Sequence, residues 1–324
     1  MNSKINIAVF TFFISFIFAG CGGGSSNSNA PDTTGSSGGN YPTSFIISGA
    51  ATDENIANYH IQVQGLNRDF SFFRPSNPEL KKLPLVIDFH GAGATVAPDF
   101  VNDPWIPIAR REKFFLLKPQ ALSDAYVSYT YWNTGWVTGR DDLLFVKTVL
   151  DSVLAQQDVD IDRIYVTGMS SGGHMAFYAA LGLKDQIAAV APISGSILSS
   201  LLSNYDFKKP MPLCKIHGDA DTIVSINGDN QLAAWSSILA KWLTNNRISN
   251  PPVITQLPDT NKNDNSTVTK YEYRGATIAS DIDSYIINNG YHSVPGIQSS
   301  ANQDINAYEV IWAFFKKHKL SDPY

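Results

Sequence analysis

The chain has 324 residues, of which 44% are hydrophobic and 16% are charged, and its net charge at pH 7 is −5. This is enough apolar material for a sizeable core, and α/β folds of this length often form one domain. The low charged fraction, the negative net charge and the lack of a Lys/Arg cluster exclude nucleic acid as an expected partner.

The N-terminal residues have the pattern of an export signal that ends in an anchor. A short apolar run over 5–18 follows Lys4, and it is shorter than a membrane span and typical of the core of a signal peptide. The run ends in FAGC at 18–21, which resembles the bacterial lipobox, whose cysteine is lipidated after cleavage. We therefore expect a lipoprotein signal peptide over 1–20 and a lipid on Cys21, the alternative being an ordinary signal peptide.

A stretch rich in Gly, Ser and Asn follows the anchor over 21–40 and is expected to be a flexible linker. As a random coil it would span about 25 Å, which holds the rest of the chain just off a membrane surface. The absence of an acidic residue directly after Cys21 resembles lipoproteins of the outer membrane. The expected location is the bacterial cell envelope, with membrane contact through the lipid only, or secretion; residues 41–324 are expected to form the folded domain.

The hydrophobic pattern from about residue 60 alternates between strands and helices. The run at 83–90 is nearly continuous, as expected of a strand buried on both faces, whereas 141–156 has apolar residues at helical spacing. This alternation predicts an α/β fold with a mostly parallel sheet and helices on both faces. The other predicted strands are 68–74, 114–117, 163–167, 187–193, 213–217 and 283–288, the other predicted helices are 171–183 and 305–318, and the polar stretch 249–267 is expected to be a surface loop.

The sequence GMSSG at 168–172 matches the G-x-S-x-G motif, and a predicted strand precedes it while a predicted helix follows it. In this context the motif predicts a nucleophile elbow, in which a sharp turn projects Ser170 at the carboxyl edge of the sheet. The helix that begins at Ser171 would point its free N–H groups toward the same place. The alternative is a glycine-rich turn that carries no chemistry.

The Gly-rich turn at 90–93 follows the buried strand and can present backbone N–H groups to a developing oxyanion. The N–H groups of Ala92 and Ser171 are the expected pair, since one donor of such a site comes from the residue after the nucleophile. The side chain of His90 is expected to be structural, bonding to this turn.

A carboxylate and a histidine downstream complete a candidate triad. Asp219 and Asp221 both lie in a loop after the strand at 213–217, where either could orient a histidine. The chain order of nucleophile, acid and base leaves two histidines as candidates for the base. His318 lies among lysines and is expected on a solvated face, whereas His292 lies in a loop just after a predicted strand and is the predicted base.

Five stretches between 83 and 318 follow, in order, the pattern of a known enzyme group. They are PLVIDFHGAGA, DDLLFVKTVLDSVLAQQDVDIDRIYVTGMSSGGHMAFYAA, HGDADTIV, GYHSVPG and DINAYEVIWAFFKKH. Together they resemble the poly(3-hydroxybutyrate) depolymerase and feruloyl esterase group, akin to carbohydrate esterase family one. The resemblance implies an α/β-hydrolase fold and hydrolysis of carboxylic esters through an acyl-enzyme. On the family pattern Ser170 is the nucleophile, Asp221 the acid and His292 the base.

The resemblance leaves the substrate open. Trp132 and Asn133 resemble a Trp-Asn at the rim of the family's active site, so Trp132 is a candidate substrate contact, with core packing as the alternative. At 291–296 the chain reads YHSVPG and lacks the tryptophan that the family often carries after its histidine. No metal or organic cofactor is implied. The expected substrates are feruloyl or other aryl esters of plant polysaccharide; the alternatives are short-chain polyhydroxyalkanoate, peptides, or a binding role without catalysis.

Overall fold

A single mixed sheet organises the computed structural model, which describes residues 42–324 except 80 and 124–126. Its strands are β1 (Asn55–Val63), β2 (Leu66–Arg74), β3 (Leu83–Phe89), β4 (Phe115–Pro119), β5 (Val159–Met169), β6 (Ala189–Ile193), β7 (Leu213–Gly218), β8 (Val253–Gln256), β9 (Thr267–Tyr273) and β10 (Ile282–Asn288). They lie in the order β1-β2-β4-β3-β5-β6-β7-β10-β9-β8. The six central strands from β4 to β10 pair in parallel, and antiparallel pairing extends both edges.

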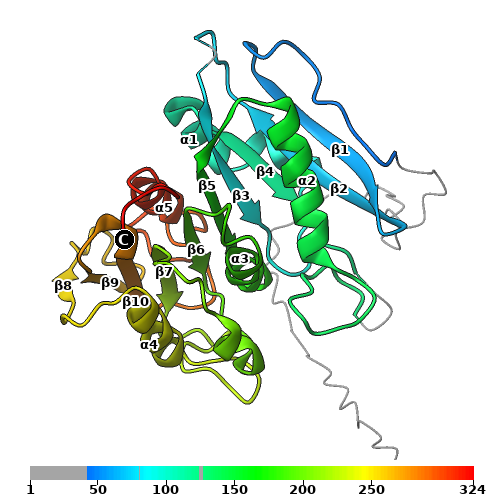
Figure 1. Cartoon of the computed structure of the whole chain (residues 1–324). Coiled ribbons are helices and arrows are strands. Elements are labelled where there is room, and N and C mark those ends of the chain that lie inside the picture. The colour runs from blue at the N-terminus through cyan, green and yellow to red at the C-terminus, as the bar shows by residue number, and fades with distance from the viewer. Residues whose placement is uncertain (1–41, 80, 124–126) are drawn as a thin grey trace, which may run out of the picture. The chain divides into compact units, whose positions relative to one another are not determined.

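Helices cover both faces of this sheet (Figure 1). They are α1 (Trp105–Glu112), α2 (Asp142–Gln156), α3 (Ser171–Gly182), α4 (Trp235–Asn245) and α5 (Ala307–Phe315), with 3₁₀ turns η1 (Ala97–Asn102), η2 (Ser199–Asn204) and η3 (Ile278–Ser280). One hydrophobic cluster joins the sheet to α2, α3 and α4, and a second joins it to α1 and α5. Strand β3 contributes side chains to both clusters, because Leu85 and Ile87 belong to the first and Val86 belongs to the second. The predicted fold class is confirmed.

Each predicted strand and helix corresponds to an observed element, but β1, β8, β9, α1 and α4 were not predicted. The prediction of a loop over 249–267 is wrong in part, because β8 and the first residue of β9 lie within it. All four side chains of β8 are exposed, as suits an edge strand. A strand with no buried face need not contain alternating apolar residues, so its sequence looked like a loop.

The expected exposure of His318 is wrong, because its side chain is fully buried. Helix α5 ends at Phe315, and the chain then turns so that the His318 ring packs against Phe314 at a centroid distance of 4.3 Å. The His318 carbonyl accepts a hydrogen bond of 2.8 Å from the Tyr165 hydroxyl in β5. Burial lowers the pKa of His318 to about 3, so the ring is neutral near pH 7.

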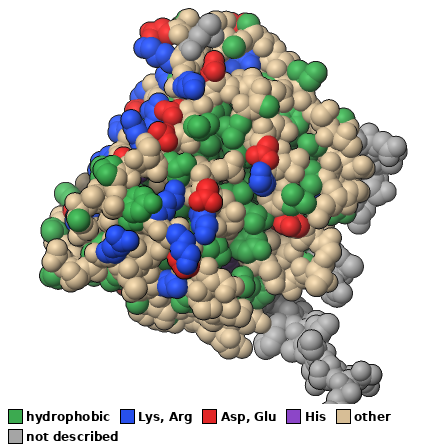
Figure 2. Space-filling model, in the orientation of Figure 1, with side chains coloured by type: hydrophobic (Ala, Val, Ile, Leu, Met, Phe, Trp, Pro, Cys, Tyr) green, Lys and Arg blue, Asp and Glu red, His purple; other side chains and the backbone are tan. Residues whose placement is uncertain are grey.

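Basic and acidic side chains lie intermixed on the face shown in Figure 2. Ion pairs such as Arg110 with Glu54 at 2.8 Å, and Arg111 with Glu309 at 2.7 Å, account for several of the chain's surface charges. These exposed pairs contribute little stability, but they keep opposite charges adjacent.

The predicted signal peptide over 1–20, the lipidated Cys21 and the linker over 21–40 all lie outside the described residues. Within the described part of the chain, no helix is both long enough and apolar enough to cross a membrane.

The free energy of unfolding is expected to fall as the pH is lowered from 7.5 to 5. Burial lowers the pKa of His90, His174 and His217 to about 4 and that of His318 to about 3. The unfolded chain therefore binds protons near pH 6.5 that the folded chain does not bind. Each pH unit below 6.5 costs up to about 1.4 kcal/mol per histidine. Thermal unfolding by circular dichroism would measure this, and a melting temperature that stays constant or rises would contradict buried neutral histidines.

Candidate active site

Ser170 occupies a strained turn between β5 and α3, with φ 58° and ψ −120°. Such a backbone costs a non-glycine residue about 1–3 kcal/mol and persists only where its surroundings hold it. Here the Ser170 N–H donates to the Ile193 carbonyl at 2.9 Å, and its carbonyl accepts from the His174 N–H at 3.0 Å. The predicted elbow is therefore present, with strand before it and helix after it.

The glycines of the motif are required by close backbone approach. A Cβ on Gly172 would overlap the Phe89 carbonyl oxygen at the end of β3, and one on Gly168 would lie 2.5 Å from the Gly172 oxygen. Only a residue without a Cβ fits at either position. The first turn of α3 consequently packs directly against the carboxyl end of β3.

The structure brings the three predicted triad residues together. His292 Nε2 lies 2.9 Å from the Ser170 hydroxyl oxygen, although the two residues are 122 positions apart in the chain. His292 Nδ1 lies 2.7 Å from Asp221 Oδ2. With the imidazole proton on Nδ1 and donated to Asp221, Nε2 is free to accept the Ser170 proton. The loops that carry Asp221 and His292 follow the neighbouring parallel strands β7 and β10.

The geometry also separates the two candidate acids. Asp221 contacts His292 through Oδ2, while its Oδ1 accepts the N–H groups of Ile223 and Val224, both at 2.9 Å. Burial raises the pKa of Asp221, but hydrogen bonds from two histidines outweigh it and hold the pKa well below its ordinary value. Asp219 instead accepts the Asn289 N–H at 2.7 Å, so it shapes the loop that leads to His292.

The turn predicted to stabilise an oxyanion lies beside Ser170. A Cβ on Gly91 would stand 3.7 Å from the Ser170 Cβ, and Ala92 follows in the same turn. As the first residue of α3, Ser171 has an N–H without an acceptor inside the helix. The roles of Ala92 and Ser171 remain predictions. His90 is structural as expected, since Nδ1 lies 2.7 Å from the Gly91 carbonyl and Nε2 accepts the Ala121 N–H at 2.9 Å.

The prediction that Trp132 contacts the substrate is wrong, because its side chain is buried and only 1% exposed. The indole N–H donates to the His90 carbonyl at 2.9 Å, and the ring packs edge-on against Phe89 at a centroid distance of 5.2 Å. Core packing, the alternative, describes this residue. Trp136, four residues further along the same loop, is 41% exposed and is the better candidate for contact with a ligand.

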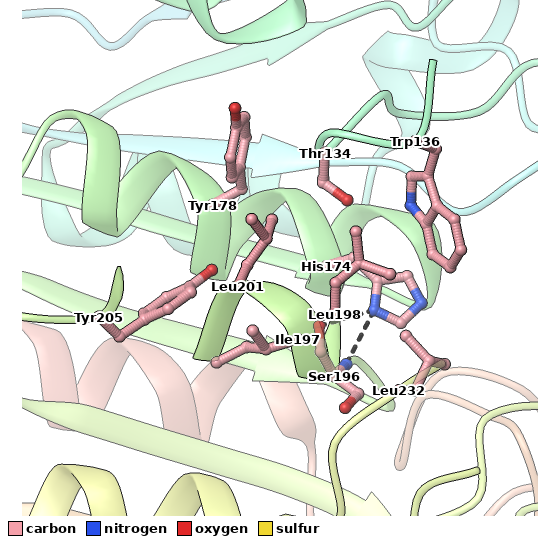
Figure 3. Close-up of a pocket in the computed structure, with 10 residues that line it drawn as sticks. All are labelled: Thr134, Trp136, His174, Tyr178, Ser196, Ile197, Leu198, Leu201, Tyr205 and Leu232. Carbon is pink, nitrogen blue, oxygen red and sulfur yellow. Dashed lines mark hydrogen bonds between the residues drawn. The ribbon is translucent and has the colours of Figure 1, made fainter. Parts of the chain in front are cut away.

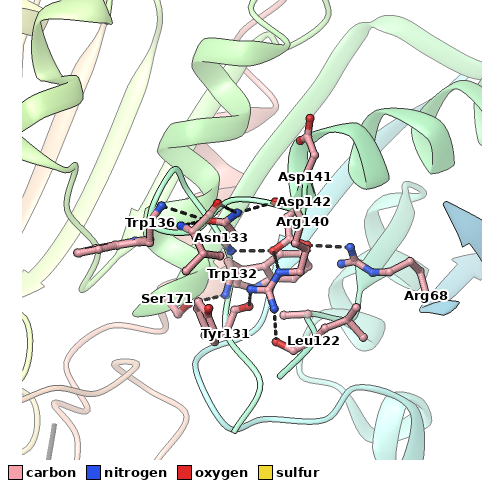
Figure 4. A network of polar contacts seen from close by, with 12 residues as sticks. Arg68, Leu122, Tyr131, Trp132, Asn133, Trp136, Arg140, Asp141, Asp142 and Ser171 are labelled. Atoms are coloured by element: carbon pink, nitrogen blue, oxygen red, sulfur yellow. Dashed lines mark hydrogen bonds and ion pairs between the residues drawn. The ribbon is translucent and has the colours of Figure 1, made fainter. Parts of the chain in front are cut away.

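A buried ion-pair network that the sequence did not reveal holds this loop in place (Figure 4). Asp142, at the start of α2, pairs with Arg68 at 2.8 Å and with Arg140 at 3.3 Å, and it accepts the Asn133 N–H at 2.7 Å. The neighbouring Trp132 N–H donates to the Ser171 hydroxyl at 3.0 Å. The network thereby connects the loop that carries Trp132 and Trp136, called the tryptophan loop below, to the first turn of α3. The two adjacent aspartates at the start of the predicted helix 141–156 were the available sequence signal.

A hollow opens along α3, one helical turn beyond the nucleophile (Figure 3). His174 forms part of its wall, and its Nδ1 lies within 2.9 Å of the Ser196 backbone. The walls are otherwise mainly aromatic and aliphatic side chains. The lining residues are Thr134, Trp136, His174, Tyr178, Ser196, Ile197, Leu198, Leu201, Tyr205 and Leu232.

Across the described residues, no cluster of three or more His, Cys, Asp or Glu side chains is arranged to hold a metal ion.

The central segment of the chain matches the model of a known family. Residues 68–207 match the family model described as esterase PHB depolymerase. The resemblance predicted from the sequence is confirmed. The segment that matches this esterase family contains Ser170 but ends before Asp221 and His292, so the acid and the base depend on the geometry above.

Relatives of the esterase family match at modest identity. The chain is 31% identical to poly(3-hydroxyalkanoate) depolymerase C of Paucimonas lemoignei over 115 residues, which are 35% of this chain and 28% of the relative. It is 26% identical to feruloyl esterase D of Neurospora crassa over 196 residues, which are 60% of this chain and 62% of the relative. The chain thus spans less than two thirds of either relative.

A solved structure shows the same fold. The acetyl xylan esterase from Aspergillus awamori superposes with a TM-score of 0.56 at 14% identity, over 80% of this chain and 98% of that one. The predicted α/β-hydrolase fold is therefore confirmed.

Asp221→Asn and Asp219→Asn form a matched pair that tests the choice of acid. Asparagine at 221 loses the charge that stabilises the imidazolium, so kcat for hydrolysis of p-nitrophenyl acetate should fall about 10³–10⁴-fold. Asparagine at 219 keeps an acceptor for the Asn289 N–H, so kcat should stay within about tenfold of the wild type. Equal losses in the two variants, or the larger loss at 219, would contradict the assignment.

Proposed function

We propose that this protein is a serine hydrolase of carboxylic esters that works through an acyl-enzyme. The observation that carries the proposal is the continuous chain of contacts from Ser170 to His292 to Asp221, at 2.9 and 2.7 Å. The side chain of His292 is 17% exposed while that of Asp221 is fully buried, so the base can meet a substrate and the acid is shielded from water.

In the proposed reaction, the Ser170 oxygen attacks the ester carbonyl as its proton moves to His292 Nε2. The tetrahedral oxyanion is stabilised by the N–H groups of Ala92 and Ser171. Cleavage of the ester bond releases the alcohol, which takes the proton from His292. Water then attacks the acyl-enzyme with His292 again as base, and the acid leaves. Asp221 holds the imidazole tautomer and stabilises its charged form throughout.

For the substrate, we propose feruloyl or related aryl esters of plant polysaccharide. The exposed ring of Trp136 beside the hollow along α3 supports this, because it offers a face on which an aromatic acyl group can stack (Figure 3). The likeness to a feruloyl esterase over 60% of the chain supports it also. The second candidate is a short-chain polyhydroxyalkanoate, which the family model and the depolymerase relative favour.

We also propose that the protein acts in the bacterial cell envelope, anchored by a lipid on Cys21. The support is the FAGC sequence at 18–21 and the flexible composition of 21–40. Expression in a bacterial host with radiolabelled palmitate would test this. Label in the wild type that disappears in Cys21→Ser is the expected result, and an unlabelled wild type would overturn the anchor.

An ester panel with Ser170→Ala as the blank tests the reaction and the substrate together. The panel comprises methyl ferulate, short and long p-nitrophenyl esters, and an oligomer of 3-hydroxybutyrate. The alanine variant should lose at least about 10⁴-fold in kcat because no nucleophile remains.

On this panel, kcat/KM should be highest for the ferulate. A preference for the oligomer would replace the aryl ester with the polyester, and no turnover that depends on Ser170 would overturn the esterase proposal.

A further inference from the structure

Two buried titratable side chains lie directly behind the acid of the triad. Lys215 and His217 both belong to β7, and their side chains are 1% and 2% exposed. The Lys215 amine lies 2.7 Å from the Gly195 carbonyl and 2.6 Å from His217 Nδ1. An amine and an imidazole in an apolar interior are costly unless their polar atoms are satisfied. Because the two side chains are paired on the strand that leads to Asp221, we asked whether they act on that carboxylate.

The contacts of His217 determine where its proton lies. Nε2 lies 2.8 Å from the Val224 carbonyl and 3.3 Å from Asp221 Oδ2. Because both neighbours are oxygen acceptors, Nε2 must carry the proton. Nδ1 is then an acceptor, and it receives a hydrogen bond from the Lys215 amine. Lys215 thus fixes the tautomer whose Nε2–H donates to the Val224 carbonyl and lies next to Asp221.

Asp221 Oδ2 consequently accepts the His292 N–H at 2.7 Å and also has the protonated Nε2 of His217 beside it at 3.3 Å, while the hydrogen bond of that nitrogen goes to the Val224 carbonyl. Its other oxygen is fixed by two backbone N–H groups of the same loop. We infer that Lys215 and His217 are positioning residues, which hold the Asp221 carboxylate in place and limit how strongly it attracts the proton of His292. The inference rests on the proposed function of the triad.

The surrounding charges agree with this role. Burial lowers the pKa of Lys215 to about 7 against the attraction of Asp221, and burial followed by the nearby Lys215 lowers the pKa of His217 to about 4. The other titratable groups facing this cluster are His292 and, on α3, His174, which burial keeps neutral near pH 7. Among the described residues, Asp221 is the only carboxylate in direct contact with Lys215 or His217.

The decisive variants are His217→Leu, which removes the N–H beside Asp221, and His217→Gln, whose amide keeps a donor for the Val224 carbonyl and an acceptor for Lys215. Without the polar N–H near its Oδ2, Asp221 attracts the imidazolium proton more strongly. We expect His217→Leu to lower kcat at least about tenfold, to leave KM within about twofold, and to move the midpoint of the acid limb of kcat/KM upward by about half a pH unit or more. His217→Gln should recover most of both changes.

Lys215→Met tests the inner residue of the pair. The change removes the hydrogen bond that fixes the tautomer, so kcat and the acid limb should shift in the same direction as in His217→Leu. Lys270→Met is the matched control, because Lys270 lies on β9, is partly buried and pairs with Glu272 and Asp283. The control should leave both kcat and the acid limb unchanged. Folded Lys215→Met and His217→Leu variants with wild-type kcat and pH profiles would overturn the inference.

One measurement needs no variant, and it tests the assigned tautomer of His217 even if the substitutions prevent folding. Nitrogen-15 NMR of the wild-type protein at pH 8 should show His217 neutral, protonated on Nε2 and unprotonated on Nδ1. A proton on Nδ1 would overturn the inference. A wild type without Ser170-dependent turnover would instead overturn the proposed function, and the two failures are thus distinguishable.

Discussion

The contact between Gly172 and the Phe89 carbonyl oxygen is the constraint on which the candidate site depends. It lets α3 begin directly against β3, and the chain can then turn sharply enough to place Ser170 above the edge of the sheet with φ 58°. The rest of the triad follows from strand order. Because β7 and β10 are parallel neighbours, the loops after them meet at the same edge and bring Asp221 and His292 to Ser170.

Buried polar networks do the finer positioning on both sides of this edge. On one side Asp142 binds Arg68, Arg140 and the backbone of the tryptophan loop. On the other, Lys215 and His217 support the acid. In the first network, removing one partner of a buried ion pair costs about 3–5 kcal/mol. In the second, a buried polar group left without its hydrogen-bond partner costs about 1–3 kcal/mol. Both therefore favour one arrangement of the loops around Ser170 before any substrate arrives.

The sequence predicted features that local chemistry determines. The elbow follows from glycine spacing between a strand and a helix, and the buried strand at 83–90 from its continuous apolar run. Features set by distant parts of the chain were not predictable in the same way. Trp132 and Trp136 differ in exposure because of tertiary packing, and nothing in the local sequence reports it. His318 was misplaced for the same reason, since its neighbours are lysines along the chain but Phe314 and Tyr165 in space.

The central claim is that Ser170 is a nucleophile activated by His292, and covalent labelling tests it most directly. The wild-type protein would be incubated with a fluorophosphonate, digested, and analysed by peptide mass spectrometry. The account predicts one phosphonyl adduct per chain, on Ser170, and a large loss of labelling rate in His292→Ala. An unlabelled folded protein, or an adduct on another residue while Ser170 stays unmodified, would contradict it.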